Sequence, residues 1–344
     1  MANFIYWHQQ SLFYIMNTFT SNNDVTVSAI IAVYNPDPIF FKQAILSVLD
    51  QIYPVLELVL VNDGGSEHFR DLLPDDSRLR VFSKQNEGVA ATRNFAIRQC
   101  RGEYIAFLDQ DDYWYPDKLQ EQFTMIPVQG EPCMVSSPIH IVDHRGIILN
   151  TLSEKCNKIY RFKTLSETVL LNLTEGNFIY SSTPLIHSSV FNKAGFYDPW
   201  TQPHDDWDMS LRVILSGFPV YFYQQKPLSV WRKHESNESN KESAMMRSKC
   251  RVEKKLLGMV KDEAVRKIAA TNLLIDYLDR DNLLYKKRLY VRFRKLTKYH
   301  IQQLILDKSN YIWHTTDLLR KLSHRVRKIV FKSARRFIVS YFLS

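Results

Sequence analysis

Four short apolar runs, each separated from the next by a helix signal or a turn, constrain the fold of this chain more than any other feature. The runs are VSAIIAVYN (27–35), LELVLV (56–61), LRVFSKQ (79–85) and EYIAFL (103–108). Such short, β-branched runs are typical of strands buried on both faces. Because strands that alternate with helices build mainly parallel sheets covered on both faces, the sequence predicts an α/β fold with a mainly parallel central sheet.

Helix signals lie between these runs. Asp37 suits an N-cap and Pro38 the first helical position, so we expect a helix from residue 38 to about 52. The segment 87–102 predicts a second helix, which stops at Gly102. Farther along, we expect strands near 133–142, 177–186 and 219–224, and a helix over about 206–215.

The charge of the chain is divided between two parts. The 344 residues have a formal net charge of +9, but residues 1–239 contain 19 Lys and Arg against 27 Asp and Glu, whereas residues 240–344 contain 26 against 9. An acidic body followed by a basic segment indicates regions with different partners. We expect an N-terminal extension (1–24), a globular domain (25–239) and a basic helical C-terminal region (240–344).

Composition argues against several other classes of protein. Hydrophobic residues make up 45% and charged residues 24%, as in globular proteins. No run of 18 apolar residues predicts a transmembrane helix, and the N-terminus lacks the basic segment of a signal peptide. The four cysteines are far apart, with no C-x-x-C pair, so neither a zinc site nor a disulfide framework is indicated. Reduced thiols and a cytoplasmic location are the expectation.

Polar clusters follow three of the apolar runs. They are Tyr34-Asn35, Asn62-Asp63 and the segment Asp109 to Asp112. Ligands of open parallel sheets bind beyond the carboxyl ends of the strands. The sequence therefore predicts that the three clusters line one crevice; ordinary loop polarity would explain one cluster, but less easily three.

The third cluster places three carboxylates, Asp109, Asp111 and Asp112, within four positions. At ~4 Å and an effective dielectric constant of ~20, each pair would repel by about 4 kcal/mol, so a cation is expected nearby. Mg²⁺ is usually held by one or two carboxylates together with substrate phosphates. Neither a P-loop nor a Rossmann glycine motif is present. These residues predict a divalent metal that bridges the protein and a diphosphate-bearing ligand.

A second acidic cluster, HDDWDMSLRV, opens the helix predicted after residue 205. Asp205, Asp206 and Asp208 fall in its first turn. Helix capping and the helix dipole account for such residues at about 0.3–1 kcal/mol each. Taken alone, this cluster favours the capping interpretation.

Four motifs together resemble the family 2 glycosyltransferases, whose fold is the nucleotide-sugar-binding GT-A fold. They are AIIAVYNP, LELVLVNDGGS, NEGVAATRNFAI and GEYIAFLDQDDYWYPDKL, in the order and spacing of that family. The resemblance covers residues 25–120 strongly and continues more weakly through 195–220 and 227–239. It implies that residues 25–130 bind a nucleotide-diphospho-sugar and that 131–239 carry the acceptor side and the catalytic base.

The resemblance also implies roles for matching residues on the donor side. Tyr34, Asp63 and Arg93 would contact the nucleotide. Asp109-Gln110-Asp111 would be the D-x-D element, with Asp109 towards the ribose, sugar or metal and Asp111 on Mg²⁺ or Mn²⁺. Asp112 would support these ligands or join them.

On the acceptor side, the resemblance makes the second acidic cluster the source of the general base. The matching position is Asp206, with Asp205 left open as the alternative. A positioned carboxylate contributes roughly 10²–10⁴-fold by taking the proton of an attacking hydroxyl. The family inverts the configuration of the anomeric carbon, so one such carboxylate suffices.

The segment WRKHES (231–236) offers a cationic closure over the diphosphate. Arg232 would contact the donor there, and His234 would be an extra metal ligand. The alternative is a solvated loop.

The last segment, 324–344, predicts an amphipathic helix with an imperfectly separated basic face. This pattern is typical of helices that lie in a membrane interface, where each basic residue is worth about 1 kcal/mol near anionic lipid. We expect peripheral attachment to the inner face of the cell membrane and a glycan or lipid-linked acceptor; packing against the acidic body is the alternative. No nucleic-acid-binding motif is present.

Two other functions compete with an inverting glycosyltransferase. A sugar-phosphate nucleotidyltransferase would open with a glycine-rich basic loop after the first strand, and AVYNPDPIF contains neither Gly nor Lys. A non-catalytic glycan- or membrane-binding module would not need acidic clusters on both sides of the predicted site. The sequence does not name the sugar, the linkage or the oligomeric state.

Overall fold

The structure is a computed structural model that describes residues 25–151, 166–262 and parts of 263–276. The predicted N-terminal extension, Cys156 and the amphipathic segment 324–344 lie outside the described residues. The division of the chain into three regions therefore stays a prediction.

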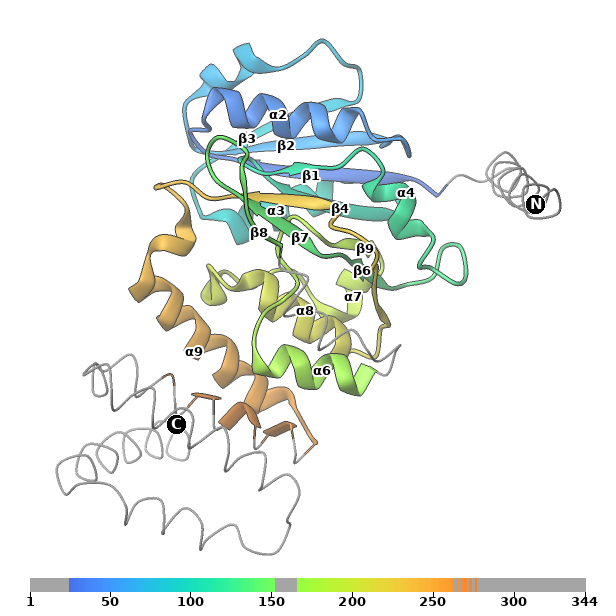
Figure 1. The fold of residues 1–344 in the computed structure, drawn as a ribbon, viewed down its shortest axis with the longest axis vertical. Helices are drawn as coiled ribbons and strands as arrows, with labels where there is room; N and C mark the ends of the chain where they lie inside the picture. The colour runs from blue at the N-terminus through green and yellow to red at the C-terminus, as the bar shows by residue number, and fades with distance from the viewer. Residues whose placement is uncertain are drawn as a thin grey trace, which may run out of the picture.

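In the described residues, the larger sheet has seven strands in the order β10-β6-β9-β4-β1-β2-β3 (Figure 1). The four predicted strands form its parallel part: β1 (Val27–Val33), β2 (Glu57–Asp63), β3 (Leu79–Lys84) and β4 (Tyr104–Asp109). Antiparallel β9 (Leu185–His187) joins β4 to β6 (Met134–Ser136), and β10 (Val220–Phe222) runs parallel to β6. The predicted α/β fold with a mainly parallel sheet is confirmed.

Helices cover both faces of this sheet. Ile31 of β1 packs in the same cluster as Phe41 and Ile45 of α2 (Pro38–Leu49), whereas Ile30 packs in the cluster that contains Ala96 of α3 (Val89–Gln99). Successive side chains of a strand point to opposite faces, so the unbroken apolar runs follow from burial on both sides. The Asp37 carboxylate caps α2 by accepting from two backbone amides, as its sequence position predicts.

A smaller sheet of four strands in the described residues has the order β5-β11-β7-β8. Its strands are β5 (Tyr113–Trp114), β11 (Ser229–Arg232), β7 (Ile139–Val142) and β8 (Ile148–Thr151). The strand expected near 133–142 is two strands, β6 and β7, in different sheets, because Ser137-Pro138 interrupts it. Proline lacks the N–H that a continuous strand would use.

The strand expected over 177–186 is also wrong in most of its length. Only β9 (Leu185–His187) is extended and paired, and residues 177–184 form a loop. This loop lies at the carboxyl edge of the sheet and carries polar side chains into the site.

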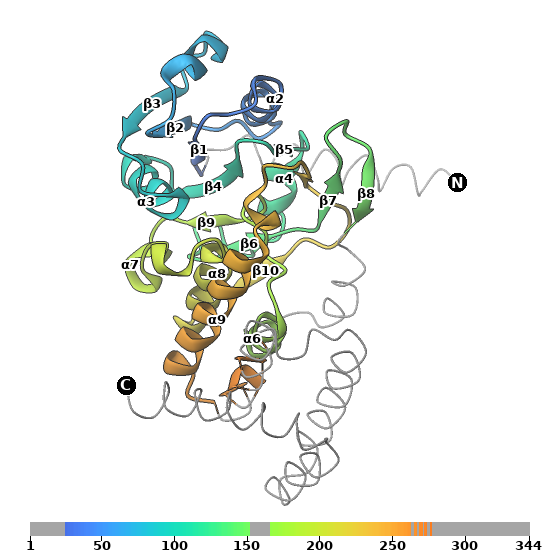
Figure 2. The same ribbon diagram turned by 90° about the vertical axis from the view of Figure 1, so that its left-hand side faces the viewer.

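The second half of the body is mainly helical. Figure 2 shows α8 (Asp205–Leu215) and α9 (Glu242–Met259) side by side below the sheet, with α6 (Ser166–Glu175) close to them. The remaining elements are η1 (Glu67–Leu72), α4 (Lys118–Phe123), α7 (Val190–Ala194), η2 (Pro199–Thr201) and η3 (Glu238–Asn240). None of the helices in the described part of the chain is long and apolar enough to cross a membrane.

Candidate active site

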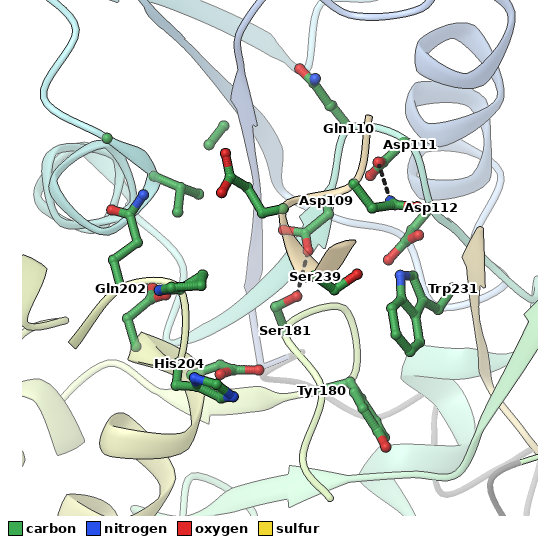
Figure 3. Close-up of a pocket in the computed structure, with 18 of the residues that line it drawn as sticks. Asp109, Gln110, Asp111, Asp112, Tyr180, Ser181, Gln202, His204, Trp231 and Ser239 are labelled. Carbon is green, nitrogen blue, oxygen red and sulfur yellow. Dashed lines mark hydrogen bonds between the residues drawn. The ribbon is translucent and has the colours of Figure 1, made fainter. Parts of the chain in front are cut away.

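A cavity of about 900 Å³ opens at the carboxyl ends of β1, β2 and β4 (Figure 3). All of the predicted site residues except Arg232 line it: Tyr34, Asp63, Arg93, Asp109, Asp111, Asp205, Asp206 and His234. The prediction that clusters far apart in the sequence share one crevice is therefore confirmed by the geometry.

Asp63 lies at the end of β2 and is engaged by the protein itself. Its carboxylate accepts from Lys84 Nζ at 2.8 Å and from the backbone amides of Glu87 and Gly88 at 3.0 and 2.9 Å. Burial alone would raise the pKa of Asp63, but these donors outweigh it and hold the pKa below its ordinary value. Asp63 thus fixes the turn that leads into α3, and the exposed Tyr34 lines the same cavity.

Gln110 ties the D-x-D segment to the end of β1. Its side-chain amide donates to the Tyr34 carbonyl at 3.1 Å and accepts from the Tyr34 amide at 2.8 Å. The middle residue of the motif therefore acts as a bridge between strands and leaves Asp109 and Asp111 to face the cavity.

Arg93 of α3 joins the two acidic clusters. One of its Nη atoms donates to Asp109 Oδ1 and the other to Asp205 Oδ2, both at 2.7 Å. Burial would lower the pKa of Arg93, but the two carboxylates hold it above the ordinary value. The residue expected to contact the nucleotide is, in this structure, the counterion shared by both clusters.

Asp111 pairs with His234. His234 Nε2 lies 2.7 Å from Asp111 Oδ2, and Asn237 Nδ2 lies 3.3 Å from the same oxygen. Both oxygens of Asp109, in contrast, are occupied by Arg93 and by the hydroxyl of Ser181. Among the described residues, no group of three or more His, Cys, Asp or Glu side chains is arranged to hold a metal.

The carboxylate of Asp111 and the imidazole of His234 are nevertheless suitable ligands for the divalent metal that the sequence predicts. Mg²⁺ and Mn²⁺ sites commonly use one or two protein ligands and complete their coordination with substrate phosphates and water. Asp111 and His234 are therefore the residues of the predicted set that could hold the metal, whereas Asp109 is held by protein partners.

Asp112 turns away from this role. Its carboxylate is buried and accepts from Ser182 Oγ at 2.6 Å and from the backbone amide of Arg232 at 2.9 Å. Burial and the neighbouring carboxylates raise its pKa well above the ordinary value. Asp112 joins β11 to the D-x-D segment.

Arg232 is buried outside the cavity lining. Its guanidinium lies 4.3 Å from the ring centroid of Phe40 and donates to Gln43 and to the carbonyl of Asp111. The side chain thus anchors the D-x-D segment to α2, and its backbone amide binds Asp112.

The structure separates the two candidates for the base. Asp205 is fully buried and paired with Arg93, and burial raises its pKa although Arg93 opposes the rise. Asp206 lines the cavity and is partly exposed. Burial and the adjacent Asp205 raise the pKa of Asp206 to about 7, against the pull of Arg93. A carboxylate with this pKa is suited to take a proton near neutral pH.

The loop of residues 177–182 contains site residues that sequence reasoning missed. Asn177 donates to Asp206, Ser181 to Asp109 and Ser182 to Asp112. Figure 3 shows Ser181 directed at Asp109. The one signal in the sequence was that these three polar residues fall within the strand predicted near 177–186.

Two aromatic side chains form part of the cavity wall. The rings of Tyr180 and Trp231 stack with centroids 5.8 Å apart, and both line the cavity. In Figure 3 they lie to one side of Asp109, with Gln202 and His204 on the other. Trp114 and Trp207, in contrast, are buried in the core.

Several known proteins are similar to this chain. The model of the family described as "Glycosyl transferase family 2" matches residues 28–182. An uncharacterized glycosyltransferase of Haemophilus influenzae is 28% identical over 258 residues, which cover 73% of this chain and 97% of that protein. TuaG of Bacillus subtilis, named for teichuronic acid biosynthesis, is 39% identical over 101 residues, 28% of this chain and 40% of that protein.

Some relatives are much longer than the matched region. A glycosyltransferase of Rickettsia felis is 28% identical over 233 residues, which are 66% of this chain but 37% of that protein. The chain thus spans little more than a third of that relative's length.

Solved structures show the same fold. S. aureus TarS (residues 1–349) in complex with UDP-GlcNAc superposes with a TM-score of 0.56 and 16% identity, covering 78% of this chain and 79% of the TarS chain. This likeness shows that the two proteins share a fold. Residues 28–182 match the model of glycosyltransferase family 2, and the described part of the chain has the GT-A-like fold that it shares with TarS.

Proposed function

We propose that this protein is an inverting glycosyltransferase that moves a sugar from a UDP-sugar to a hydroxyl of a glycan or lipid-linked acceptor. One observation carries the proposal: a pair suited to a metal, Asp111 and His234, and a partly exposed carboxylate suited to a base, Asp206, face the same cavity. The UDP moiety is proposed because the fold is shared with TarS, whose solved structure holds UDP-GlcNAc.

On the donor side, the proposed nucleotide site is the wall formed by Tyr34 and the turn that Asp63 holds. Asp111 and His234 would hold Mg²⁺ or Mn²⁺, which supplies Lewis-acid stabilisation of the diphosphate leaving group. Arg93 pairs with both Asp109 and Asp205 beside this wall and offsets part of their negative charge. It thereby limits repulsion between these carboxylates and the diphosphate.

On the acceptor side, Asp206 takes the proton of the attacking hydroxyl. The hydroxyl oxygen forms a bond to the anomeric carbon as the bond from that carbon to the diphosphate oxygen breaks, and the diphosphate leaves with the electron pair. Attack from the opposite face inverts the configuration. Tyr180 and Trp231 offer aromatic faces for the acceptor, and aromatic side chains suit the apolar face of a sugar ring because they combine flat area with polar edges.

Binding and turnover with a panel of UDP-sugars test this function. Saturation-transfer NMR with Mn²⁺ should detect UDP-sugar binding by the wild-type chain, and UDP release should report turnover. Asp111→Ala and His234→Ala should weaken the metal-dependent part of binding. Asp206→Asn should keep binding and lose turnover by roughly 10²-fold or more.

Asp71→Asn is the matched control, because the Asp71 side chain is 80% exposed and lies outside the cavity. It should behave as the wild type. Turnover by Asp206→Asn within a few-fold of the wild type would remove Asp206 as the base. Failure of the wild type to bind any UDP-sugar would reject the proposed donor class.

A further inference from the structure

Asn177 lies between α6 and β9 and lines the cavity. Its Nδ2 donates to Asp206 Oδ2 at 3.0 Å, and its Oδ1 accepts from the backbone amide of Ile179 at 3.1 Å. The second bond fixes which end of the amide points at Asp206, because only the oxygen can accept from an N–H. Asn177 is thus oriented as a donor to this carboxylate.

The other oxygen of Asp206 is held by its own helix. Oδ1 accepts from the backbone amide of Trp207 at 2.7 Å. The indole N–H of Trp207 donates to the Leu173 carbonyl of α6 at 2.8 Å, which ties the helix of Asp206 to the helix that Asn177 follows. The donor and the acceptor of the Asn177–Asp206 bond are therefore anchored by the same packing.

Charged groups near Asp206 do not replace this bond. The two Nη atoms of Arg93 donate their hydrogen bonds to Asp109 and Asp205. Within the part of the chain that the structure describes, Asn177 is the one side chain that donates a hydrogen bond to the Asp206 carboxylate. The charged or titratable groups around Asp206 are Asp205 on α8, Arg93 on α3, Asp109 at β4, Tyr197 before η2, His204 before α8 and Lys249 on α9.

We propose that Asn177 is a positioning residue that fixes the Asp206 carboxylate for proton transfer. This inference rests on the proposed role of Asp206 as the base. The terminal torsion of an aspartate is broad and roughly two-fold, so a carboxylate held at one oxygen alone can turn. A second donor restricts that rotation and favours the charged form, which is the form that accepts a proton.

Two variants and one control test the inference. Asn177→Ala removes the donor, and Asn177→Asp keeps the shape but places a carboxylate where the donor was. Asn192→Ala is the control, because Asn192 is exposed on α7 and lies outside the cavity. For each, kcat and KM for UDP release from UDP-GlcNAc and the other UDP-sugars of the panel are measured across pH.

Asn177→Ala should lower kcat about 10- to 100-fold, the scale of a hydrogen bond to a charged group, and leave the donor KM within about two-fold. The acid limb of kcat should move to higher pH, and further for Asn177→Asp because of charge repulsion. Asn192→Ala should change neither. A purely structural role would lower the melting temperature or the active fraction without moving the limb.

Titration of the aspartate carboxyl carbons by ¹³C NMR gives a readout that needs no turnover. The Asp206 signal, assigned by its loss in Asp206→Asn, should titrate at higher pH in both Asn177 variants. An unmoved titration together with an unchanged kcat would overturn the role of Asn177 while leaving the proposed function intact. Full turnover by Asp206→Asn would instead overturn the proposed function itself.

Discussion

Arg93 offers the sharpest test of how the two acidic clusters coexist. Its side chain is 7% exposed and its partner Asp205 is 2% exposed, whereas Asp109 is 35% exposed. Arg93→Met keeps much of the side-chain volume and removes the charge. Removal of one partner from a buried ion pair costs about 3–5 kcal/mol, because the other charge is left uncompensated. The pair with Asp109 adds less than about 1 kcal/mol, since solvent screens it.

The melting temperature of Arg93→Met should therefore fall by roughly 6–20 °C, at about 2–4 °C for each kcal/mol in a body of this size. Arg98→Met is the matched control on the same helix, because the Arg98 guanidinium is exposed and contacts the Phe196 ring and the Asn94 carbonyl. The stability lost by Arg98→Met should stay near 1 kcal/mol. Calorimetry or a thermal melt monitored by circular dichroism measures both.

The pH dependence of this loss of stability separates the effect of the removed charge from the effect of altered packing. A protonated Asp205 needs no counterion, and burial raises the pKa of this carboxyl above its ordinary value. The difference between Arg93→Met and the wild type should accordingly shrink as the pH falls through the range where Asp205 takes up its proton. A loss equal to that of Arg98→Met, or a large loss that does not change with pH, would refute the view of Arg93 as a shared counterion.

Three further predictions concern other parts of the molecule. The pKa of Asp206 is raised from 3.8 to about 7, so ionisation of Asp206 destabilises the folded state. This loss of stability is absent below the ordinary pKa and complete above the raised pKa. Asp206→Asn should raise the melting temperature at about pH 8 and not at about pH 4, and a gain that is equal at both would contradict this. Gly88 has φ +89° and an added Cβ would lie 2.7 Å from Gln202 Oε1, so Gly88→Ala should destabilise by at least about 1–2 kcal/mol in thermal unfolding. Gly258→Ala, on α9 with open space around it, should instead stabilise by about 0.5–1 kcal/mol, and equal shifts would show that the backbone argument is wrong. Finally, a chain that ends near residue 322 should sediment less with anionic liposomes than the full chain; equal binding would reject the segment 324–344 as a membrane contact.

Much of the fold could be predicted because its signals are local. The runs at 27–35, 56–61, 79–85 and 103–108 predict strands from burial on both faces, and all four are present with ends shifted by a few residues. The strand predicted over 177–186 was wrong because its apolar residues, including Phe178 and Ile179, are buried in a loop. A short apolar run records burial and does not distinguish a loop from a strand.

For the site, too, some features follow from local sequence and others only from tertiary packing. The sequence by itself determined which carboxylates stand at the ends of strands, since the carboxyl ends of parallel strands meet at one edge, and so it identified Asp63, Asp109 and Asp111 as neighbours. The pair Asp205-Asp206 opens a helix, and only the resemblance to a known family assigned it to the same site. Only the tertiary structure decided what each one does, because a carboxylate's role depends on the donors around it and on its exposure. Arg93 neutralises Asp205, Arg232 is buried against Phe40, and Asp206 is left facing the cavity with Asn177 beside it. Those contacts join residues as far apart in the sequence as Phe40 and Arg232, and no local pattern encodes them, because they exist only once the chain has packed.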